Sequence, residues 1–376
     1  MSSRRVRRWL RRASGVSAIA RIATAVIGLW LVGISQAAAQ PTAAFADKTL
    51  TILVGFQAGG TIDNFARALA PFLRQHLPGH PNVVVQSMPG AGGLIASNYV
   101  FEKARADGLT VSFGSWDPLA QALGSPGVRA RYDQFAFVGG IDDIRVVYAR
   151  VDAIPGGIRR PADIMQADGI AIGALNTTSI STLMAQLALK VLGVKDRIIS
   201  GYRGGNDIFL ALQRGEVQFH NTSIGTYRSR GADLVRSGQG IGVAYLTPVD
   251  AGGGFERQPL ITEMPAFPDL YREIHGRMPS GPDWEALNWL TLLFGEVTFI
   301  ALAPPATPQP VLAALRAGFA AAVADPEFAE RATKANGFPH RAIDAQRGAA
   351  VLASVASVAP AVVDAVRNAI AATAKP

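Results

Sequence analysis

Short apolar runs alternate with helical patterns along most of the chain. The first run, residues 50–56, is followed by a Gly-rich turn and by a pattern in which apolar residues recur at i, i+3, i+4 and i+7 from Phe65. The same order recurs, with runs at 83–85 and 109–113 on either side of a helical pattern at 94–104. This alternation predicts β-α-β units on a largely parallel sheet.

The middle of the chain predicts a second α/β unit. It begins with a long β-prone stretch at 135–148, interrupted at Gly139 and Gly140, and it ends with a run at 241–246 that we expect to cross back to the first unit. Between them we expect strands at 170–172, 197–202 and 217–219, and helices at 181–192 and 207–214.

The C-terminal third combines an irregular stretch with helices. Residues 251–283 are rich in Gly and Pro and are predicted to form a long surface excursion. A strongly apolar stretch at 289–302 follows it. Helical patterns then occupy 311–323, 327–335 and 343–372, the last of which Pro360 is expected to kink or divide.

These patterns together predict an α/β protein that consists of two lobes joined by two crossings. Each lobe is a largely parallel sheet flanked by helices, and two crossing strands form the hinge. We expect the first lobe to comprise residues 47–146 and 247–376 and the second lobe to comprise 147–246. The length of 376 residues suits about two domains, and a cleft between lobes is where small ligands usually bind.

The charge of the chain is concentrated at its N-terminus. The formal net charge is +8, yet seven arginines lie within the first 39 residues, which hold no Lys and no acid. An apolar run at 22–34 and three alanines at 37–39 follow, which is the layout of a secretory signal peptide covering residues 1–39. Removing these arginines from the 36 basic residues leaves 29 against 28 acidic ones, so nucleic acid is not expected as a partner.

The leader predicts export, with cleavage after Ala39 or, as a second choice, after Ala46. An uncleaved membrane anchor is the alternative, although the apolar run of about 13 residues is shorter than the roughly 20 that span a bilayer. The arginine-rich start leaves both the general secretory route and the twin-arginine route open.

Several classes of site are excluded by what the sequence lacks. With no Cys, it has no disulfide scaffold, no Cys-ligated zinc, no iron–sulfur cluster, no Cys nucleophile and no lipid-modified N-terminal Cys. The pattern G-x-G-x-x-G fails at Ile95, and neither a P-loop nor a G-x-S-x-G elbow occurs. The five histidines match no ligand or catalytic pattern. We therefore expect no cofactor, no metal site and no catalytic residue.

Two Gly-rich turns of the first lobe are the strongest candidates for ligand binding, because each follows a strand and precedes a helix. Gly lets the backbone approach a ligand closely, and the next helix N-terminus offers unpaired N–H groups and a partial positive charge that suit an anion. The alternative is an ordinary tight connection that Thr61 or Asp63 caps. The candidates are Gln57, Ala58, Gly59, Gly60, Thr61 and Asp63, then Gly90, Ala91 and Gly92, and beside them Ser115 and Trp116.

The second lobe has two comparable segments. Hydroxyl and amide groups at 176–179 precede a helix, where they can cap it or bind carboxylate oxygens. A second Gly turn at 202–205 carries Arg203, which is either a surface side chain or a bidentate partner for a carboxylate. The candidates are Asn176, Thr177, Thr178, Ser179, Tyr202, Arg203, Gly204 and Gly205.

The order of these motifs resembles the periplasmic solute-binding receptors of tripartite tricarboxylate transporters, the Bug or TctC family. Any one motif is weak, but their order and spacing over about residues 48–335 are fairly specific. The matching segments are F-x-x-G-G-x-x-D at 56–63, P-G-A-G-G at 89–93, D-G at 107–108, Y-R-G at 202–204, G-E-V at 215–217, F-G at 294–295, A-P-P-A-T-P at 303–308 and D-P-E at 325–327.

The resemblance implies a two-lobed periplasmic-binding-protein fold, whose lobes close on an organic acid held largely by backbone N–H groups and hydroxyls. It adds Asn221 and Thr222 to the second-lobe contacts named above. The chain departs from the family pattern at Ala58, where Pro is usual, at Thr182, where His is frequent, and at Thr222, near a common Asp. The 251–283 stretch is also longer than usual, so the binding mode is better indicated than any one ligand.

The leading hypothesis is therefore a non-enzymatic periplasmic receptor for a small organic acid, such as a di- or tricarboxylate or an aromatic carboxylate. We expect a monomer that delivers its ligand to inner-membrane transporter subunits. Two alternatives are a receptor for a sensor or signalling partner and, with less support, a secreted hydrolase or lyase.

Overall fold

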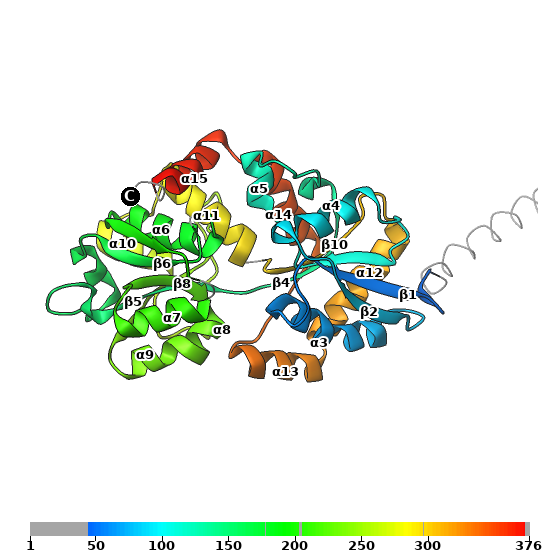
Figure 1. The fold of residues 1–376 in the computed structure, drawn as a ribbon, viewed down its shortest axis with the longest axis horizontal. Helices are drawn as coiled ribbons and strands as arrows, with labels where there is room; N and C mark the ends of the chain where they lie inside the picture. Colours follow the sequence, from blue (N-terminus) through cyan, green and yellow to red (C-terminus); the bar gives the residue numbers. More distant parts are fainter. Residues whose placement is uncertain (1–43, 177, 203–204, 296, 373–376) are drawn as a thin grey trace, which may run out of the picture.

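The computed structural model describes residues 44–372 other than 177, 203–204 and 296, so the predicted signal peptide lies outside the described residues. Two sheets form two lobes (Figure 1). The sheet of the first lobe has the order β11-β4-β10-β3-β1-β2. Its strands are β1 (Thr49–Val54), β2 (Asn82–Ser87), β3 (Thr110–Phe113), β4 (Ala136–Ile141), β10 (Phe299–Ala303) and β11 (Ala342–Ile343).

Helices cover both faces of this first sheet because its strands are apolar on both sides. One face packs against a cluster that includes Leu50, Ile52 and Phe319, and the other against a cluster that includes Leu53 and Val100. The first cluster is completed by α3 (Thr61–His76), α12 (Gln309–Ala324) and α13 (Pro326–Asn336), and the second by α4 (Leu94–Glu102), α5 (Pro118–Leu123) and α14 (Ala345–Ser357).

The sheet of the second lobe has the order β7-β6-β8-β5-β9. Its strands are β5 (Arg145–Arg150), β6 (Ile170–Ala174), β7 (Asp196–Ser200), β8 (Phe219–Ser223) and β9 (Gly240–Leu246). One face carries α6 (Ile180–Leu192), α10 (Phe267–His275), α11 (Pro282–Gly295) and α15 (Pro360–Ala372), and the other carries α7 (Gly205–Arg214), α8 (Ile224–Thr226) and α9 (Ala232–Arg236).

The two-lobed α/β fold that the sequence predicts is confirmed, and both sheets are mixed. The strands β1, β2 and β3 pair in parallel, as do β6, β7 and β8, whereas the remaining pairs are antiparallel. The antiparallel strands are those next to the crossings between lobes. Parallel pairing is therefore confined to the true β-α-β units.

The β-prone stretch 135–148 is interrupted at 142–144 rather than at the two glycines. Gly139 and Gly140 lie inside β4, because a side chain there would collide with the residues packed on the strand. A Cβ atom on Gly139 would lie 2.1 Å from the Phe319 ring, and one on Gly140 would lie 2.7 Å from Val297. Gly139 therefore allows α12 to pack closely on the sheet, Gly140 does the same for the segment before β10, and neither glycine forms a turn.

The stretch 251–283 is not merely a surface excursion, and the return to the first lobe comes later than predicted. The stretch holds α10 and the start of α11, whose apolar faces join the cluster around α6. Strand β9 is an edge strand, and the chain crosses back only after Gly295. The two crossing segments run side by side, with the Asp143 N–H donating to the Gly295 carbonyl at 2.9 Å.

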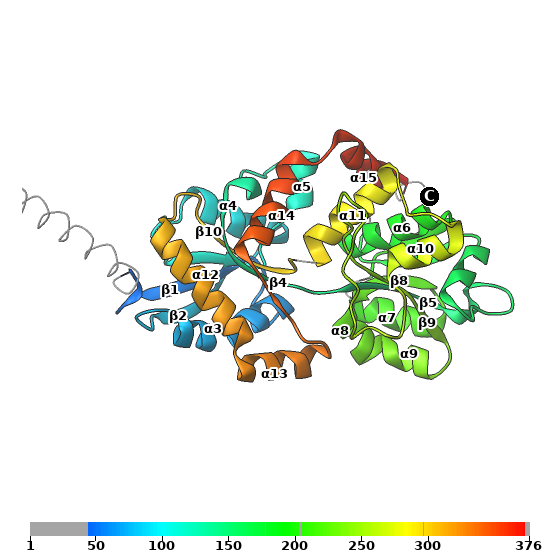
Figure 2. The same cartoon turned by 180° about the vertical axis from the view of Figure 1, so that it is seen from behind.

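We expected all of residues 247–376 in the first lobe, but α10, α11 and α15 lie against second-lobe elements. The chain makes a third crossing between α14 and α15, which Pro360 divides as predicted (Figures 1 and 2). The two helices are bent by 77°. In the described part of the chain, no single helix has the length and hydropathy of a membrane span; only this bent pair meets that test together.

A short loop after α13, which we call the hinge strap (residues 337–341), links the lobes on the other side. Phe338 is 4% exposed and lies in the second-lobe cluster with Ile224 and Tyr227. The Arg228 guanidinium lies 5.5 Å from the centre of the Phe338 ring. Further along the strap, Arg341 pairs with Asp142 of the first crossing at 2.9 Å.

Candidate ligand site between the lobes

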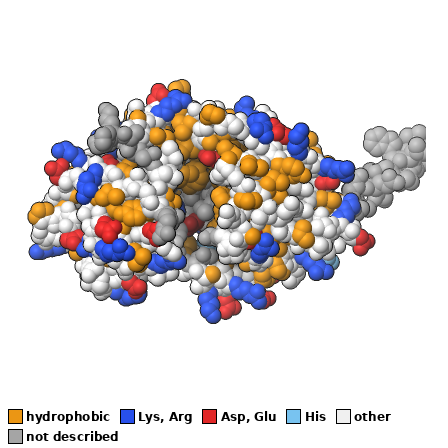
Figure 3. Space-filling model, in the orientation of Figure 1, with side chains coloured by type: hydrophobic (Ala, Val, Ile, Leu, Met, Phe, Trp, Pro, Cys, Tyr) orange, Lys and Arg blue, Asp and Glu red, His pale blue; other side chains and the backbone are white. Residues whose placement is uncertain are grey.

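The predicted ligand turns of the two lobes lie on facing edges of the two sheets. In the first lobe, β1, β2 and β3 are parallel and end at one edge, where the crossing after β4 also leaves. In the second lobe, Arg145 at the start of β5 is paired with Ser223 at the end of β8 and with Leu246 at the end of β9. The crossing enters at this edge, so the turns of both lobes lie at the sheet edges that face each other across the crossing. Figure 3 shows that the molecule is hollowed between its two halves.

The first Gly-rich turn is exposed and is held by a buried carboxylate. Residues 57–60 are exposed, and Gly59 has φ +82°. Asp63 is fully buried and accepts hydrogen bonds from the Gly59 N–H at 2.9 Å and from Arg67 at 2.8 and 3.0 Å. Ser87 donates a further bond at 3.2 Å. Asp63 thus fixes the turn and has little capacity left for a ligand.

The pKa of Asp63 lies below its usual value, first because Arg67 donates to the carboxylate and second because the Gly59 N–H does. The carboxylate therefore stays charged throughout the neutral range and keeps the turn in place. Thr61 is the first residue of α3, whose N-terminus follows the turn.

The second turn adopts left-handed backbone angles, with φ +140° at Gly90, +47° at Ala91, +65° at Gly92 and +96° at Gly93. It lies directly against the first turn, because a Cβ atom on Gly55 would be only 2.7 Å from the Gly93 Cα atom. Glycines are required at this contact on steric grounds.

Ser115 connects the two turns through hydrogen bonds on the side of the hydrophobic core. Its hydroxyl accepts from the Gly55 N–H, and its carbonyl accepts from the Ser97 hydroxyl, each at 2.5 Å. Ser115 is fully buried, and the adjacent Trp116 is 7% exposed. The Trp116 ring lies 5.9 Å from the Tyr132 ring and 5.8 Å from the Phe294 ring. Both residues thus support the turns from within the core.

The segment 176–179 immediately precedes α6, with Ser179 at its N-cap position. The Asn176 carboxamide oxygen accepts from the Thr178 N–H at 3.0 Å and from its hydroxyl at 3.1 Å, and the Ser179 hydroxyl contacts that of Thr182 at 2.5 Å. Asn176 and Thr178 are exposed. This segment presents the N-terminus of a 13-residue helix at the edge that faces the first lobe. Thr177 lies outside the described residues.

The second-lobe Gly turn is described only in part. Tyr202 is partly buried, and desolvation together with the nearby Glu216 raises the pKa of its hydroxyl. Gly205 is the first residue of α7. Arg203 and Gly204 lie outside the described residues, so the expectation that Arg203 binds a carboxylate stays a prediction.

Asn221 is the second-lobe candidate with the most specific contacts, and they lead to a residue that the sequence analysis missed. Asn221 is fully buried, and its oxygen accepts from Arg145 Nε at 3.1 Å and from Nη2 at 2.7 Å. Its Nδ2 donates to the Val146 carbonyl at 3.2 Å. Thr222 follows, partly buried. The only sequence signal for Arg145 is its position as a lone cation in a long apolar run.

Two titratable groups near Arg145 are buried. Burial raises the pKa of Asp143 to about 7, an effect that Arg145 opposes and Asp142 reinforces. Burial, with help from the Arg145 charge, lowers the pKa of His220 to about 4. At neutral pH, His220 is therefore uncharged, and Asp143 is close to its midpoint.

The pH dependence of stability tests the burial of Asp143. Because its pKa is raised above the ordinary value of 3.8, its protonated form stabilises the fold, and this contribution is lost as the pH rises from about 4 to about 7. We expect the free energy of unfolding of Asp143→Asn, relative to that of the wild type, to increase by about 2 kcal/mol between pH 5 and pH 8. Urea denaturation of both proteins at both pH values measures it, and a constant difference would contradict the assignment.

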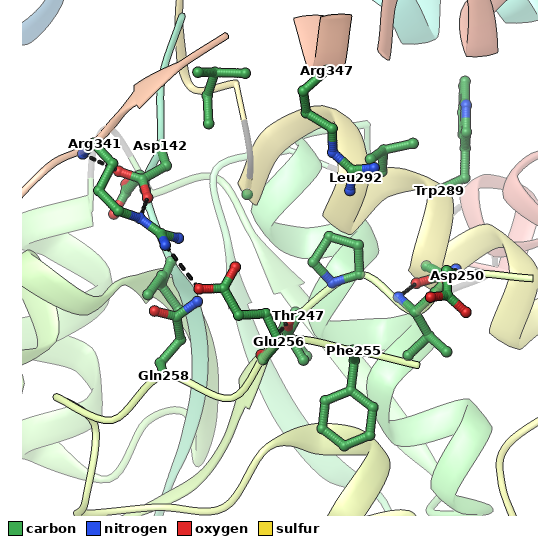
Figure 4. A pocket seen from close by; sticks show the side chains of 18 of the residues that line it. Asp142, Thr247, Asp250, Phe255, Glu256, Gln258, Trp289, Leu292, Arg341 and Arg347 are labelled. Atoms are coloured by element: carbon green, nitrogen blue, oxygen red, sulfur yellow. Dashed lines mark hydrogen bonds and ion pairs between the residues drawn. The ribbon is translucent and has the colours of Figure 1, made fainter. Parts of the chain in front are cut away.

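A separate cavity of about 850 Å³ lies at the hinge, which the sequence did not predict (Figure 4). Both lobes line it, through Asp142, Trp289 and Arg341 among others. Arg341 reaches across to bind Asp142 at 2.9 Å and Glu256 at 2.8 Å. The walls of the cavity carry several further carboxylates. The predicted Gly turns do not line this cavity. Among the described residues, no cluster of three or more His, Asp or Glu side chains could hold a metal ion.

Comparison with known sequences gives two relatives, although no family model matches the chain. A UPF0065 protein of Pseudomonas sp. strain P51, from the tcbD–tcbE intergenic region, is 25% identical over 308 residues, which are 79% of this chain and 80% of the relative. Protein BugT of Bordetella pertussis strain Tohama I is 38% identical over 100 residues, which are 26% of this chain and 30% of BugT.

Solved structures share the fold over most of the chain. A TctC solute-binding protein from Polaromonas has a TM-score of 0.63 at 19% identity, covering 85% of this chain and 98% of its own. The periplasmic binding protein BugD has a TM-score of 0.54 at 24% identity, covering 86% and 98%. MatC of Rhodopseudomonas palustris, solved with malate, has a TM-score of 0.53 at 21% identity, covering 86% and 99%. The resemblance that the motifs indicated is thus confirmed: the chain is similar in sequence to BugT over 100 residues and has the two-lobed fold of TctC-type solute-binding proteins.

Proposed function

We propose that the chain is a periplasmic receptor that captures a small organic acid between its lobes and presents it to a membrane transporter. The basic leader supports export, and the near-neutral charge of the remaining chain fits a ligand held locally rather than by bulk attraction. MatC, which shares the fold, was solved with malate, a dicarboxylate. The relatives with this fold are named as binding proteins, which supports binding without turnover.

The observation that carries the proposal is the pair of facing edges. Each edge offers exposed backbone next to a helix N-terminus, α3 in the first lobe and α6 in the second. Buried polar groups, Asp63 and Ser115, hold the first-lobe turns in one conformation. Preformed N–H groups of this kind favour an anion, and each helix terminus adds roughly 0.3–1 kcal/mol at a wet site.

Lobe closure follows from a ligand that touches both edges. Such a ligand makes its full set of contacts only when the edges approach, so it shifts the equilibrium toward a closed form. A micromolar affinity corresponds to about −8.2 kcal/mol, which N–H contacts from both lobes and desolvated walls can supply. We propose that the transporter recognises this closed form.

A ligand screen tests the function. The chain without residues 1–39 is titrated with malate, succinate, adipate, citrate and benzoate while its melting temperature is followed. We expect at least one acid to raise the melting temperature in a saturable way and isothermal calorimetry to give a finite Kd. If none of these acids stabilises the protein, the organic-acid assignment is wrong.

A matched pair of glycine variants locates the binding site. Gly92 in the second turn and Gly238 in the loop before β9 both have positive φ, +65° and +72°, and at both positions a Cβ atom would meet no other atom within 4 Å. We expect Gly92→Val to abolish the ligand-induced shift, because its side chain would cover the turn. Gly238→Val carries similar backbone strain at the far edge of the sheet and should leave the shift intact. Equal effects would place the ligand elsewhere.

A further inference from the structure

The hinge cavity is separate from the sheet edges where we place the organic acid. Its volume of about 850 Å³ lies in the range of cavities that hold small molecules. None of the described residues of the predicted Gly turns belongs to its walls. The walls come from the first crossing, the loop after β9, α11 and the strap, represented by Asp143, Phe255, Trp289 and Arg341 (Figure 4).

Acidic side chains outnumber basic ones on the walls of this cavity. Six carboxylates face two guanidiniums among the described lining residues, a difference of four charges when every group is ionised. One guanidinium, that of Arg341, already serves both Asp142 and Glu256. An excess of negative charge in a partly enclosed space attracts a cation. The acidic residues are Asp142, Asp143, Asp250, Glu256, Glu285 and Asp344, and the basic ones are Arg341 and Arg347.

Asp143 differs from the other acidic residues because it is buried without a partner side chain. It is 8% exposed, and in the described part of the chain only the N–H of the adjacent Ile144 supports its carboxylate. Arg145 acts on it through its charge but donates to Asn221 instead. A carboxylate withdrawn from water without donors is unfavourable. A ligand that brings N–H groups and a positive charge would complete Asp143.

Trp289 is a second polar group on these walls that lacks a partner. The residue is 8% exposed, and its buried indole Nε1 has no hydrogen-bond partner among the described residues. Figure 4 shows its ring across the cavity from Arg341 and Asp142. Indole is the side-chain ring that attracts cations best. The hydrogen-bonding capacity of the walls is thus not used up, and one wall suits an organic cation.

The arrangement favours an organic cation over a metal ion. No three His, Asp or Glu side chains of the described ranges are placed to hold a metal, and the lining carboxylates are spread over four segments of the chain. An ammonium ion needs only one carboxylate at contact distance. Its carbon chain can then lie against the apolar surface of Trp289 and Leu292.

We propose that the hinge cavity is a second binding site, for a small organic ammonium ion whose N–H groups bind the carboxylate of Asp143. This site goes beyond the proposed function, because the organic acid takes no part in it. Both lobes line the cavity, so the ammonium ion contacts both.

Calorimetry with four small compounds tests the ligand class. Propylamine, 1,4-diaminobutane, 1-propanol and magnesium chloride are titrated into the chain without residues 1–39 at pH 7. We expect saturable binding of the two amines and none of propanol or magnesium ion at the same concentrations. Two buffers of different ionisation enthalpy should also reveal release of a fraction of a proton, because Asp143 is close to its midpoint at this pH and the ammonium ion favours its charged form.

Two variants separate direct contact from general attraction. Asp143→Asn and Glu285→Gln each remove one negative charge from the cavity walls, but Glu285 is exposed. We expect Asp143→Asn to weaken propylamine binding at least tenfold and to abolish the proton release, as for one charge-assisted contact. Glu285→Gln should weaken binding less than threefold and keep the proton release.

The outcomes separate this site from the organic-acid site. If the wild type binds neither amine, or if both variants weaken binding equally, the inference is wrong. If Asp143→Asn does not fold, the proton release of the wild type decides, and its absence overturns the role of Asp143. Gly92→Val should leave amine binding unchanged, and a loss there would place the amine in the cleft. Amine binding without any organic-acid binding would overturn the proposed function alone.

Discussion

Replacing Asp63 with alanine is expected to lower the free energy of unfolding by about 3 kcal/mol and to weaken ligand binding at least tenfold. The carboxylate is buried and receives four hydrogen bonds, so its removal frees the Gly59 N–H and Ser87 along with Arg67. The first turn then loses the contact that sets its left-handed Gly59. Urea denaturation at pH 7 and a ligand titration measure the two effects.

The pH dependence and a surface variant serve as controls for Asp63. Its pKa is lowered in the fold, so its contribution is present above the ordinary value of 3.8 and is lost as the pH falls through the folded pKa. The wild type and Asp63→Ala should therefore converge in stability in strong acid. Asp364→Ala removes an exposed pair with Arg367 and should cost less than about 0.5 kcal/mol. A comparable loss in both variants would contradict the special role of Asp63.

Phe338→Ala is expected to lower the free energy of unfolding by about 3–4 kcal/mol, because it empties a buried ring site. The ring also bridges the lobes, since the strap leaves the first lobe and Phe338 packs in the cluster of the second. We therefore also expect the ligand-free variant to have a broader distribution of lobe separations. Urea denaturation gives the first quantity, and small-angle X-ray scattering gives the second.

An exposed neighbour provides the control for Phe338. Leu260 is 55% exposed in the same region, and its carbonyl, not its side chain, accepts from Arg228. Leu260→Ala should change stability by less than about 0.5 kcal/mol and leave the scattering curve unchanged. A loss below 1 kcal/mol in Phe338→Ala would show that the ring does not tie the lobes together.

The sequence predicts the features that local patterns encode. The first-lobe turns stand out because Gly and polar residues interrupt apolar runs at strand ends. Asp63 is recognisable there as a ligand candidate or a helix cap, but not as the buried carboxylate that holds the turn. Gly139 is different, because a glycine inside a strand looks like a break unless the Phe319 ring that occupies its Cβ space is known. Local pattern alone does not distinguish a glycine that turns the chain from one that admits a neighbour.

The features that the sequence does not predict depend on partners far apart in the chain. The Arg145 guanidinium is oriented by Asn221, which is 76 positions away along the sequence. Neither residue lies in a sequence motif that would single it out. Nothing in the sequence separates Phe338 from the other phenylalanines among the 17 in the chain. Its role appears only from the second-lobe cluster in which it packs. The stretch 251–283 resembles an excursion because its Gly and Pro residues obscure α10. The apolar face of α10 packs against β9 and residues 161–166, which lie outside its own segment.

The position of α15 has a consequence for the order in which the protein can fold. This last helix fills the core of the second lobe against α11 and α6, while α14 just before it completes the first lobe against β4. Neither hydrophobic core can close until almost the whole chain has been synthesised. Folding therefore depends on contacts of very long sequence separation, which form slowly. We expect such a chain to stay open during synthesis until α14 and α15 complete the two lobes, which would suit the export proposed above.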